Sequence, residues 1–176
     1  LRRDGLLILA NHPTLIDVVF LVSLVENADC VVKARLARNP FTRGPVRAAN
    51  YLCNDSGADL IADCIRSLHG GSNLVIFPEG TRTPLDGRLR MQRGAANIAV
   101  RGGIDVTPVL IDCTPRSLTK GLPWWRVPRS RMQFSIEVRD DIAVAPFLAA
   151  AGDEYALAAR RLTDHLQTYF ETEKPA

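Results

Sequence analysis

The chain reads Asn11-His12-Pro13-Thr14-Leu15-Ile16-Asp17 at the point where an apolar run over residues 6–9 passes into a helical pattern. The apolar run predicts a buried strand over residues 6–10, and the pattern after it predicts a helix over residues 15–26. A histidine therefore stands where a strand ends, and an aspartate stands in the first turn of the next helix. A strand followed at once by a helix is typical of an α/β fold.

Spacing alone leaves two interpretations of this junction open. Pro13 suits the start of a helix, and residues 14–17 match the capping-box pattern [ST]-x-x-[DE], so helix initiation alone explains both polar residues. In the second interpretation, the Asp17 carboxylate folds back to accept the Nδ1 proton of His12. The Nε2 atom of His12 is then left to take a proton from a nucleophile, as a general base does.

Short apolar runs and helical patterns alternate along the rest of the chain. Further strands are predicted over residues 30–32, 51–53, 73–77, 106–111 and 132–138, and further helices over residues 58–68, 94–100 and near the C-terminus. This alternation predicts one α/β domain over residues 1–176, a sandwich whose mixed but mostly parallel central sheet is flanked by helices. Sites in such folds form at the carboxyl ends of strands, where residues 11–12 and 78–82 both fall.

A second motif, Phe77-Pro78-Glu79-Gly80-Thr81-Arg82, follows the most apolar of these strands. Its structural interpretation is a turn in which Glu79 and Arg82 form a surface ion pair, which stabilises little. In the functional interpretation, Gly80 lets the backbone approach a ligand, Thr81 supplies a hydroxyl, and Arg82 binds a phosphate with its guanidinium. Glu79 then orients that arginine or an acceptor hydroxyl.

The composition is that of an ordinary globular protein, with 47% hydrophobic and 23% charged residues. The formal charge of +3 does not predict nucleic-acid binding. The four cysteines show no C-x-x-C spacing, so we expect reduced, buried thiols of a cytosolic protein rather than a zinc site or disulfides. No stretch is long and apolar enough to span a bilayer. Because the chain starts at Leu1 and enters a strand almost at once, we expect a longer protein whose N-terminal part holds a helix or an anchor.

Taken together, residues 11–17 and 77–82 closely resemble the first and third motifs of the glycerolipid, or lysophosphatidic acid, acyltransferase family, in the same order. Residues 106–109 resemble its fourth motif, a strand with an internal proline, and residues 91–96 resemble the segment between the third and fourth. The resemblance covers about residues 6–111. It implies the family's α/β fold and a single acyltransferase domain over residues 1–176.

The resemblance also implies a chemistry. An acyl group passes from acyl-CoA or acyl-carrier protein to a hydroxyl of a lysophospholipid-like acceptor, with His12 as general base and Asp17 orienting it. The acceptor oxygen attacks the thioester directly, so no acyl-enzyme, metal or cofactor is expected. The positions that match the motifs and are expected to bind substrate are Asn11, Glu79, Gly80, Thr81 and Arg82.

One departure from the family concerns its second motif, which usually contains a glycine and ends in an arginine that helps to hold the acceptor phosphate. The corresponding residues 49–55 contain neither. Arg43 or Arg47 compensates from the preceding loop, or the acceptor is not a glycerol phosphate.

Residues 117–128 resemble, more weakly, a subgroup linked to aryl-polyene or xanthomonadin pigment synthesis in Gram-negative bacteria, which implies a carrier-protein donor and an unusual lipid acceptor. Trp124 and Trp125 lie beside Arg126, Arg129 and Arg131, a composition typical of an interfacial membrane anchor, although burial of the tryptophans in the core explains them equally well. We therefore expect a peripheral protein at the cytoplasmic face of the inner membrane.

Two other classes of function remain as alternatives. The first is a lipid- or phosphate-binding module that keeps the fold without turnover. The second is a hydrolase that pairs His12 with a serine, which is disfavoured because no serine stands in a G-x-S-x-G elbow.

Overall fold

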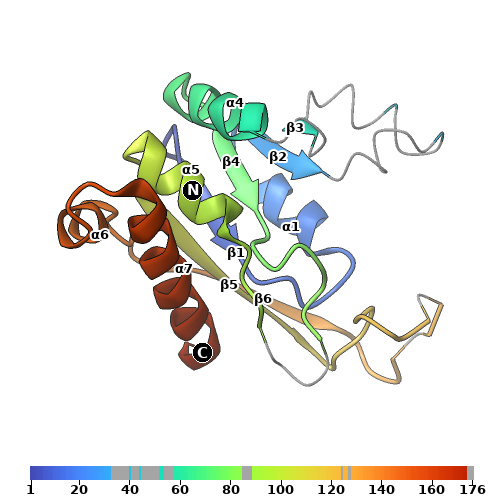
Figure 1. Ribbon diagram of the computed structural model, residues 1–176. Coiled ribbons are helices and arrows are strands. Elements are labelled where there is room, and N and C mark those ends of the chain that lie inside the picture. Colours follow the sequence, from blue (N-terminus) through green and yellow to red (C-terminus); the bar gives the residue numbers. More distant parts are fainter. Residues whose placement is uncertain are drawn as a thin grey trace.

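A six-stranded sheet forms the central layer of the described part of the protein (Figure 1). The computed structural model describes residues 1–32, 40, 44, 52–53, 58–84, 89–123, 125–126 and 128–173. The strands lie in the order β3-β2-β4-β1-β5-β6. Their bounds are β1 Leu7–Ala10, β2 Ala28–Val32, β3 Leu52–Cys53, β4 Asn73–Ile76, β5 Val106–Thr114 and β6 Gln133–Val138.

The central strand β1 leads directly to His12. It pairs in parallel with β4 on one side and β5 on the other, and Leu9 lies opposite Ile76 of β4. All four residues of β1 are buried, as expected of an apolar strand covered on both faces. Because β1 and β4 are parallel and in this register, the residues that follow them leave the same edge of the sheet side by side. The first and third motifs are therefore neighbours.

The sheet is mixed, as the sequence predicted. The pairs β1–β4, β1–β5, β2–β3 and β2–β4 are parallel, whereas β6 runs antiparallel to β5 at the edge. The two long strands β5 and β6 are joined by the loop over residues 115–132, which projects from the lower right of the molecule in Figure 1.

Helices cover both faces of the sheet. The bounds are α1 Asp17–Leu24, α4 Ala58–His69, α5 Arg93–Gly102, α6 Ala145–Ala150 and α7 Tyr155–Thr172. Leu21 of α1 shares one buried cluster with Ile8 of β1, whereas α4, α5 and α7 share the other cluster with Leu7 and Leu9. Alternate residues of β1 thus serve two cores, and the predicted α/β sandwich is confirmed. None of the helices in the described residues is both long and apolar enough to cross a membrane.

Within the described residues the predicted elements are present, with some shifted ends and one addition. The helix predicted over residues 15–26 spans Asp17–Leu24, and the strand predicted over residues 106–111 continues to Thr114. The short helix α6 was not predicted, because six residues do not establish a helical period.

Candidate active site

His12 and Asp17 form the hydrogen-bonded pair that the strand-to-helix junction predicted. The Nδ1 atom of His12 lies 3.0 Å from Oδ2 of Asp17. A carboxylate only accepts hydrogen bonds, so Nδ1 carries the proton and Nε2 is left as an acceptor. The imidazole is partly buried and lies against the ring of Phe77, with centroids 4.5 Å apart. This is the tautomer and the orientation that a general base requires.

Asp17 is fully buried and is held by Thr14 as well as by His12. The backbone N–H of Thr14 donates to Oδ2 of Asp17 at 2.6 Å, and its hydroxyl donates to Oδ1 at 2.5 Å. The helix begins at Asp17 with Ile16 as its N-cap, and no side chain caps it. Thr14 is therefore not the N-cap residue, although the bond from its backbone N–H to the Asp17 carboxylate is one that the capping-box pattern predicts. The Asp17 carboxylate instead gathers three donors that fix the position of the histidine.

The third motif clamps the backbone of His12 on both sides. Oε1 of Glu79 accepts the backbone N–H of His12 at 3.1 Å, and the backbone N–H of Thr83 donates to the carbonyl of His12 at 2.7 Å. The Thr83 hydroxyl donates to the same Oε1 of Glu79 at 2.7 Å. Gly80 allows the loop to close in this way, because its φ of +64° suits glycine and few other residues. The two motifs are thus one hydrogen-bonded unit.

Glu79 lies inside the protein, contrary to the surface ion pair considered from sequence. Its side chain is buried, it makes no ion pair with Arg82, and its Oε2 has no hydrogen-bond partner. Desolvation by this burial raises the pKa of Glu79, although its hydrogen bonds from Thr83 and His12 oppose the rise. An apolar cavity lies beside His12, and Glu79 is not among the residues that line it. Glu79 thus holds the His12 backbone, and its predicted contact with substrate stays a prediction.

Arg82 lies at this cavity and is anchored to the loop over residues 115–132. Its Nη1 atom donates to the carbonyls of Leu118 at 2.9 Å and Thr119 at 3.2 Å. The carbonyl of Leu118 also accepts the backbone N–H of Leu15 at 3.1 Å. Arg82 thereby links the third motif to the loop beside α1, and within the described residues its Nε and Nη2 atoms make no hydrogen bond.

Asn11 has a different environment from the one predicted. Its side-chain amide donates to the carbonyl of Ile111 at 2.8 Å and accepts the N–H of Ile111 at 2.7 Å. Both polar atoms are thus used to extend the pairing of the first motif with β5, and Asn11 does not line the cavity of His12. Asn11 thus positions the first motif against β5, and its predicted contact with substrate stays a prediction.

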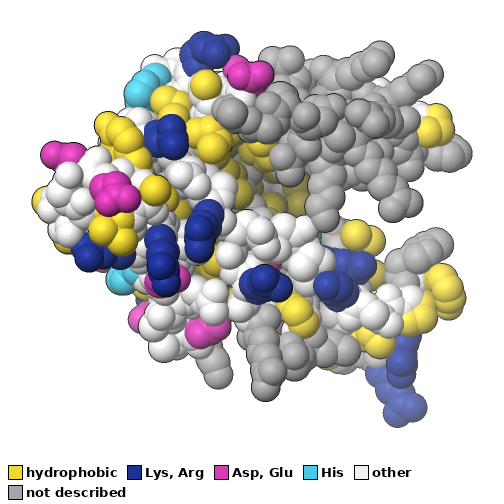
Figure 2. All heavy atoms as spheres, viewed as in Figure 1, with side chains coloured by type: hydrophobic (Ala, Val, Ile, Leu, Met, Phe, Trp, Pro, Cys, Tyr) yellow, Lys and Arg dark blue, Asp and Glu magenta, His cyan; other side chains and the backbone are white. Residues whose placement is uncertain are grey.

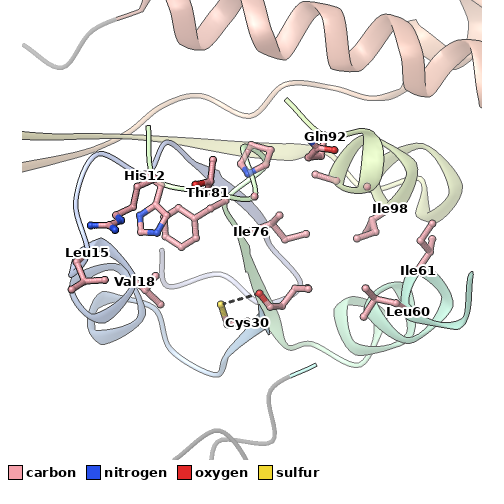
Figure 3. Close-up of a pocket in the computed structure, with 17 residues that line it drawn as sticks. His12, Leu15, Val18, Cys30, Leu60, Ile61, Ile76, Thr81, Gln92 and Ile98 are labelled. Atoms are coloured by element: carbon pink, nitrogen blue, oxygen red, sulfur yellow. Dashed lines mark hydrogen bonds between the residues drawn. The ribbon is translucent and has the colours of Figure 1, made fainter. Parts of the chain in front are cut away.

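An apolar cavity of about 490 Å³ opens beside His12. Figure 3 shows His12, Leu15 and Val18 at one end and Leu60, Ile61 and Ile98 at the other, with Ile76 and Cys30 between them. The walls come from α1, β2, α4, β4 and α5. Thr81 lies beside His12 in Figure 3, Gln92 lies nearer Ile98, and Arg82 also lines the cavity. The cavity has the size and the apolar walls of a ligand pocket.

The structure thus separates the predicted site residues into groups. His12, Gly80, Thr81 and Arg82 line the cavity, and Asp17 supports His12 from behind. Arg43 and Arg47 lie outside the described residues, so their predicted role in binding phosphate stays a prediction.

Sequence reasoning missed the contributions of Thr14 and Thr83. The signal for Thr14 was present, because the [ST]-x-x-[DE] pattern pairs it with Asp17. Thr83 carried no comparable signal, since its contact depends on how the third motif curves.

Three of the cysteines are free and buried: Cys30, Cys64 and Cys113. Burial raises the pKa of Cys30, which lines the cavity, to about 11. A thiol with such a pKa is a poor nucleophile at neutral pH.

The fold and the site together define a class of protein. A His–Asp pair at the mouth of an apolar cavity, at the carboxyl edge of an α/β sheet, is suited to deprotonate a hydroxyl beside an apolar chain. The family model described as Acyltransferase matches residues 1–112, more than half of the 176 residues. The chain belongs to this acyltransferase family, which confirms the family that its motifs resemble.

Similar proteins carry more specific names. The chain is 27% identical over 118 residues to the chloroplastic 1-acyl-sn-glycerol-3-phosphate acyltransferase LPAT1 of Arabidopsis thaliana, which covers 64% of this chain and 33% of that protein. It is also 27% identical over 111 residues to the 1-acyl-sn-glycerol-3-phosphate acyltransferase of Pseudomonas aeruginosa, which covers 58% of this chain and 42% of that protein. The chain therefore matches less than half the length of these relatives.

A solved structure with the same fold is also among the matches. The crystal structure of the 1-acyl-sn-glycerophosphate (LPA) acyltransferase PlsC from Thermotoga maritima matches with a TM-score of 0.66 and 21% sequence identity, covering 99% of this chain and 69% of that one. This likeness confirms the predicted fold class.

Proposed function

We propose that this chain transfers an acyl group from a thioester, acyl-CoA or acyl-carrier protein, to a hydroxyl of a lysophospholipid-like acceptor. The observation that carries the proposal is the orientation of His12, whose Nδ1 is bound to buried Asp17 and whose Nε2 is left for the cavity. Membership of the acyltransferase family supports an acyl group as the group that is transferred. The names of the relatives support an acceptor of the glycerol-phosphate type.

The reaction is a direct transfer. Nε2 of His12 takes the proton of the acceptor hydroxyl while the oxygen attacks the thioester carbonyl, and Asp17 stabilises the imidazolium that forms. The tetrahedral intermediate collapses with cleavage of the C–S bond, and the imidazolium returns its proton to the leaving thiolate. The products are an ester and a free thiol, and neither a metal nor a cofactor is needed. Cys30 has no part in this step, because its raised pKa keeps it protonated.

The apolar cavity holds the acyl chain in this proposal. Its walls are aliphatic from Leu15 to Ile61, and burying a methylene in such a site stabilises binding by about 0.8 kcal/mol. The thioester carbonyl then lies at the end beside His12 and Thr81. The far wall at Leu60, Ile61 and Ile98 sets the length of chain that fits (Figure 3).

Arg82 is the residue best placed to bind the acceptor phosphate. Among the described residues that line the cavity it is the one cation, and its Nη1 atom is fixed by two carbonyls. A guanidinium held in this way presents its remaining N–H groups to a phosphate at little cost in conformational entropy. Arg43 or Arg47, which lie outside the described residues, would add a second cation.

The donor and the place of action complete the proposal. The resemblance of residues 117–128 to the pigment-linked subgroup favours acyl-carrier protein over acyl-CoA. A lipid acceptor places the protein at a membrane, which we take to be the cytoplasmic face of the inner membrane.

The test offers the purified protein radiolabelled palmitoyl-CoA or palmitoyl-acyl-carrier protein together with lysophosphatidic acid, glycerol 3-phosphate or lysophosphatidylcholine. We expect a labelled diacyl lipid and one equivalent of free thiol, and the product identifies the acceptor. Binding of the lipids without product from any pair would contradict transfer and favour a lipid-binding protein of the same fold. Covalent labelling of a serine by a fluorophosphonate, with loss of thioesterase activity, would favour a hydrolase.

A further inference from the structure

The outward face of α1 is apolar and exposed. Val19 is 68% exposed, Leu24 is 56% exposed and Phe20 is also exposed, as is Leu15 just before the helix begins. The hydroxyl on this face belongs to Ser23 and is already satisfied, because it donates to the carbonyl of Phe20 at 2.7 Å. Within the helix only Asp17 and Leu21 are fully buried. Large apolar side chains gathered on one exposed surface indicate an interaction site.

This face is continuous with the cavity. Leu15 is half exposed and also lines the cavity, and Val18 on the next turn lines it too. Figure 3 shows both side chains at the end of the cavity where His12 lies. An apolar chain that moves along α1 therefore enters the cavity without crossing a polar rim at these residues. A protein seated on α1 would cover this entrance.

A basic loop lies beside the apolar face. Residues 115–132 contain five cations and no aspartate or glutamate. The loop is fixed to the start of α1 by the bond from Leu15 N–H to the carbonyl of Leu118 at 3.1 Å, and Phe134 just after it packs on Phe20 with ring centroids 4.8 Å apart. Trp125 in the loop is 67% exposed. The exposed cations of the loop include Lys120, Arg126, Arg129 and Arg131.

The space-filling view (Figure 2) shows that apolar and basic side chains are mixed in the region of the loop. In Figure 2, apolar and basic side chains lie next to one another over the lower right of the molecule, where Figure 1 places the loop over residues 115–132. Exposed aliphatic groups beside a tryptophan and arginines are typical of an element that lies in a membrane interface.

We propose that the outer face of α1 and the loop over residues 115–132 form one docking face for an anionic lipid bilayer. The apolar side chains of α1 enter the boundary between headgroups and acyl chains, while the arginines and Lys120 contact lipid phosphates. The acceptor lipid then passes from the bilayer along α1 to His12. This entry route rests on the proposed acyl transfer, whereas docking itself does not.

The test measures binding to vesicles of phosphatidylethanolamine and phosphatidylglycerol, and to vesicles of phosphatidylcholine alone. The double variants V19Q/L24Q and R129Q/R131Q change the two halves of the docking face without touching a residue of the cavity. Each is expected to weaken partitioning onto anionic vesicles by about tenfold or more. Binding of the wild-type chain falls with added salt and is weaker on phosphatidylcholine. Tyr155→Gln, a change at a half-exposed aromatic residue on α7, is the matched control and leaves binding unchanged.

A second measurement separates docking from catalysis. With a short-chain, water-soluble acyl donor and acceptor, V19Q/L24Q keeps its wild-type kcat, whereas with the acceptor embedded in vesicles its rate falls in step with binding. Vesicle binding by the wild type without any acyl transfer would leave docking intact and refute the proposed function. Docking is overturned if V19Q/L24Q binds anionic vesicles as the wild type does, or if the wild type binds none. It is also overturned if size-exclusion chromatography shows that the change dissociates a dimer, since a second copy would then cover α1.

Discussion

Replacement of Thr14 by valine tests how the His–Asp pair is held. Valine has the shape of threonine but lacks the hydroxyl that donates to Oδ1 of Asp17 at 2.5 Å. A hydrogen bond to a buried charged group contributes about 1.5–3 kcal/mol. If this energy is lost from the positioning of Asp17, kcat falls about tenfold to a hundredfold. KM stays the same, because Thr14 does not line the cavity of His12.

The assay is steady-state acyl transfer together with thermal unfolding of each variant. Thr14→Ser restores the hydroxyl and recovers most of kcat. Thr163→Val is the matched control, because Thr163 is also buried and its hydroxyl donates to the carbonyl of Ala159 within α7 at 2.7 Å. This variant loses stability but keeps kcat. The reasoning is refuted if Thr14→Val raises KM and leaves kcat unchanged, or if it behaves as Thr163→Val does.

Three further predictions concern the third motif, the cavity and its thiol. Glu79→Gln keeps an oxygen that accepts the His12 N–H but removes the ionisable group. Because burial raises the pKa of Glu79, the free energy of unfolding of the wild type falls as pH rises above the ordinary pKa of 4.5. In unfolding experiments the variant therefore becomes more stable relative to the wild type from that pH upward. A constant difference across this range would show that Glu79 is not desolvated. Ile61→Phe narrows the end of the cavity far from His12, so kcat/KM falls about tenfold for each methylene of the acyl donor that no longer fits. Ile65→Phe lies on the same helix but outside the cavity, so kcat/KM keeps its wild-type dependence on acyl-chain length. Cys30, with a pKa of about 11, reacts with iodoacetamide at pH 8 about a hundredfold more slowly than an exposed cysteine. Mass spectrometry after timed labelling measures this rate, and labelling of Cys30 as fast as that of an exposed cysteine would contradict the prediction.

The catalytic geometry could be predicted from sequence where it depends on local spacing. His12 and Asp17 are five residues apart across a strand-to-helix junction, and that separation is enough to bring Nδ1 to the carboxylate. The alternation of apolar runs and helical patterns likewise predicted the mixed sheet and both helical layers. These features depend on periodicity and on neighbouring residues.

The roles of Asn11 and Glu79 could not be predicted in this way. Asn11 binds the backbone of Ile111, a residue 100 positions away, so its role depends on how β1 and β5 align. Glu79 lies in a loop with the polar composition of a surface turn, yet the curvature of that loop turns its carboxyl inward to the His12 backbone. Motif matching marks both residues as important without saying what their side chains contact.

The cavity was also beyond sequence reasoning. Its walls combine residues from α1, α4 and α5, each of which reads as an ordinary helix in isolation. The exposed face of α1 has a related cause, because the helix is apolar on every side and its sequence does not say which side faces the sheet.

The role of His12 as the base is tested most directly by single-turnover acyl transfer with His12→Ala, with thiol release from the donor followed in the presence and absence of the acceptor. The account predicts that the variant still folds, with a lowered melting temperature because buried Asp17 loses one of its three donors, and that its acceptor-dependent rate falls by about a hundredfold or more. Asp17→Asn should reduce the rate in the same way, because the buried amide no longer fixes the tautomer of His12. Acceptor-dependent thiol release at the wild-type rate in folded His12→Ala would contradict the account.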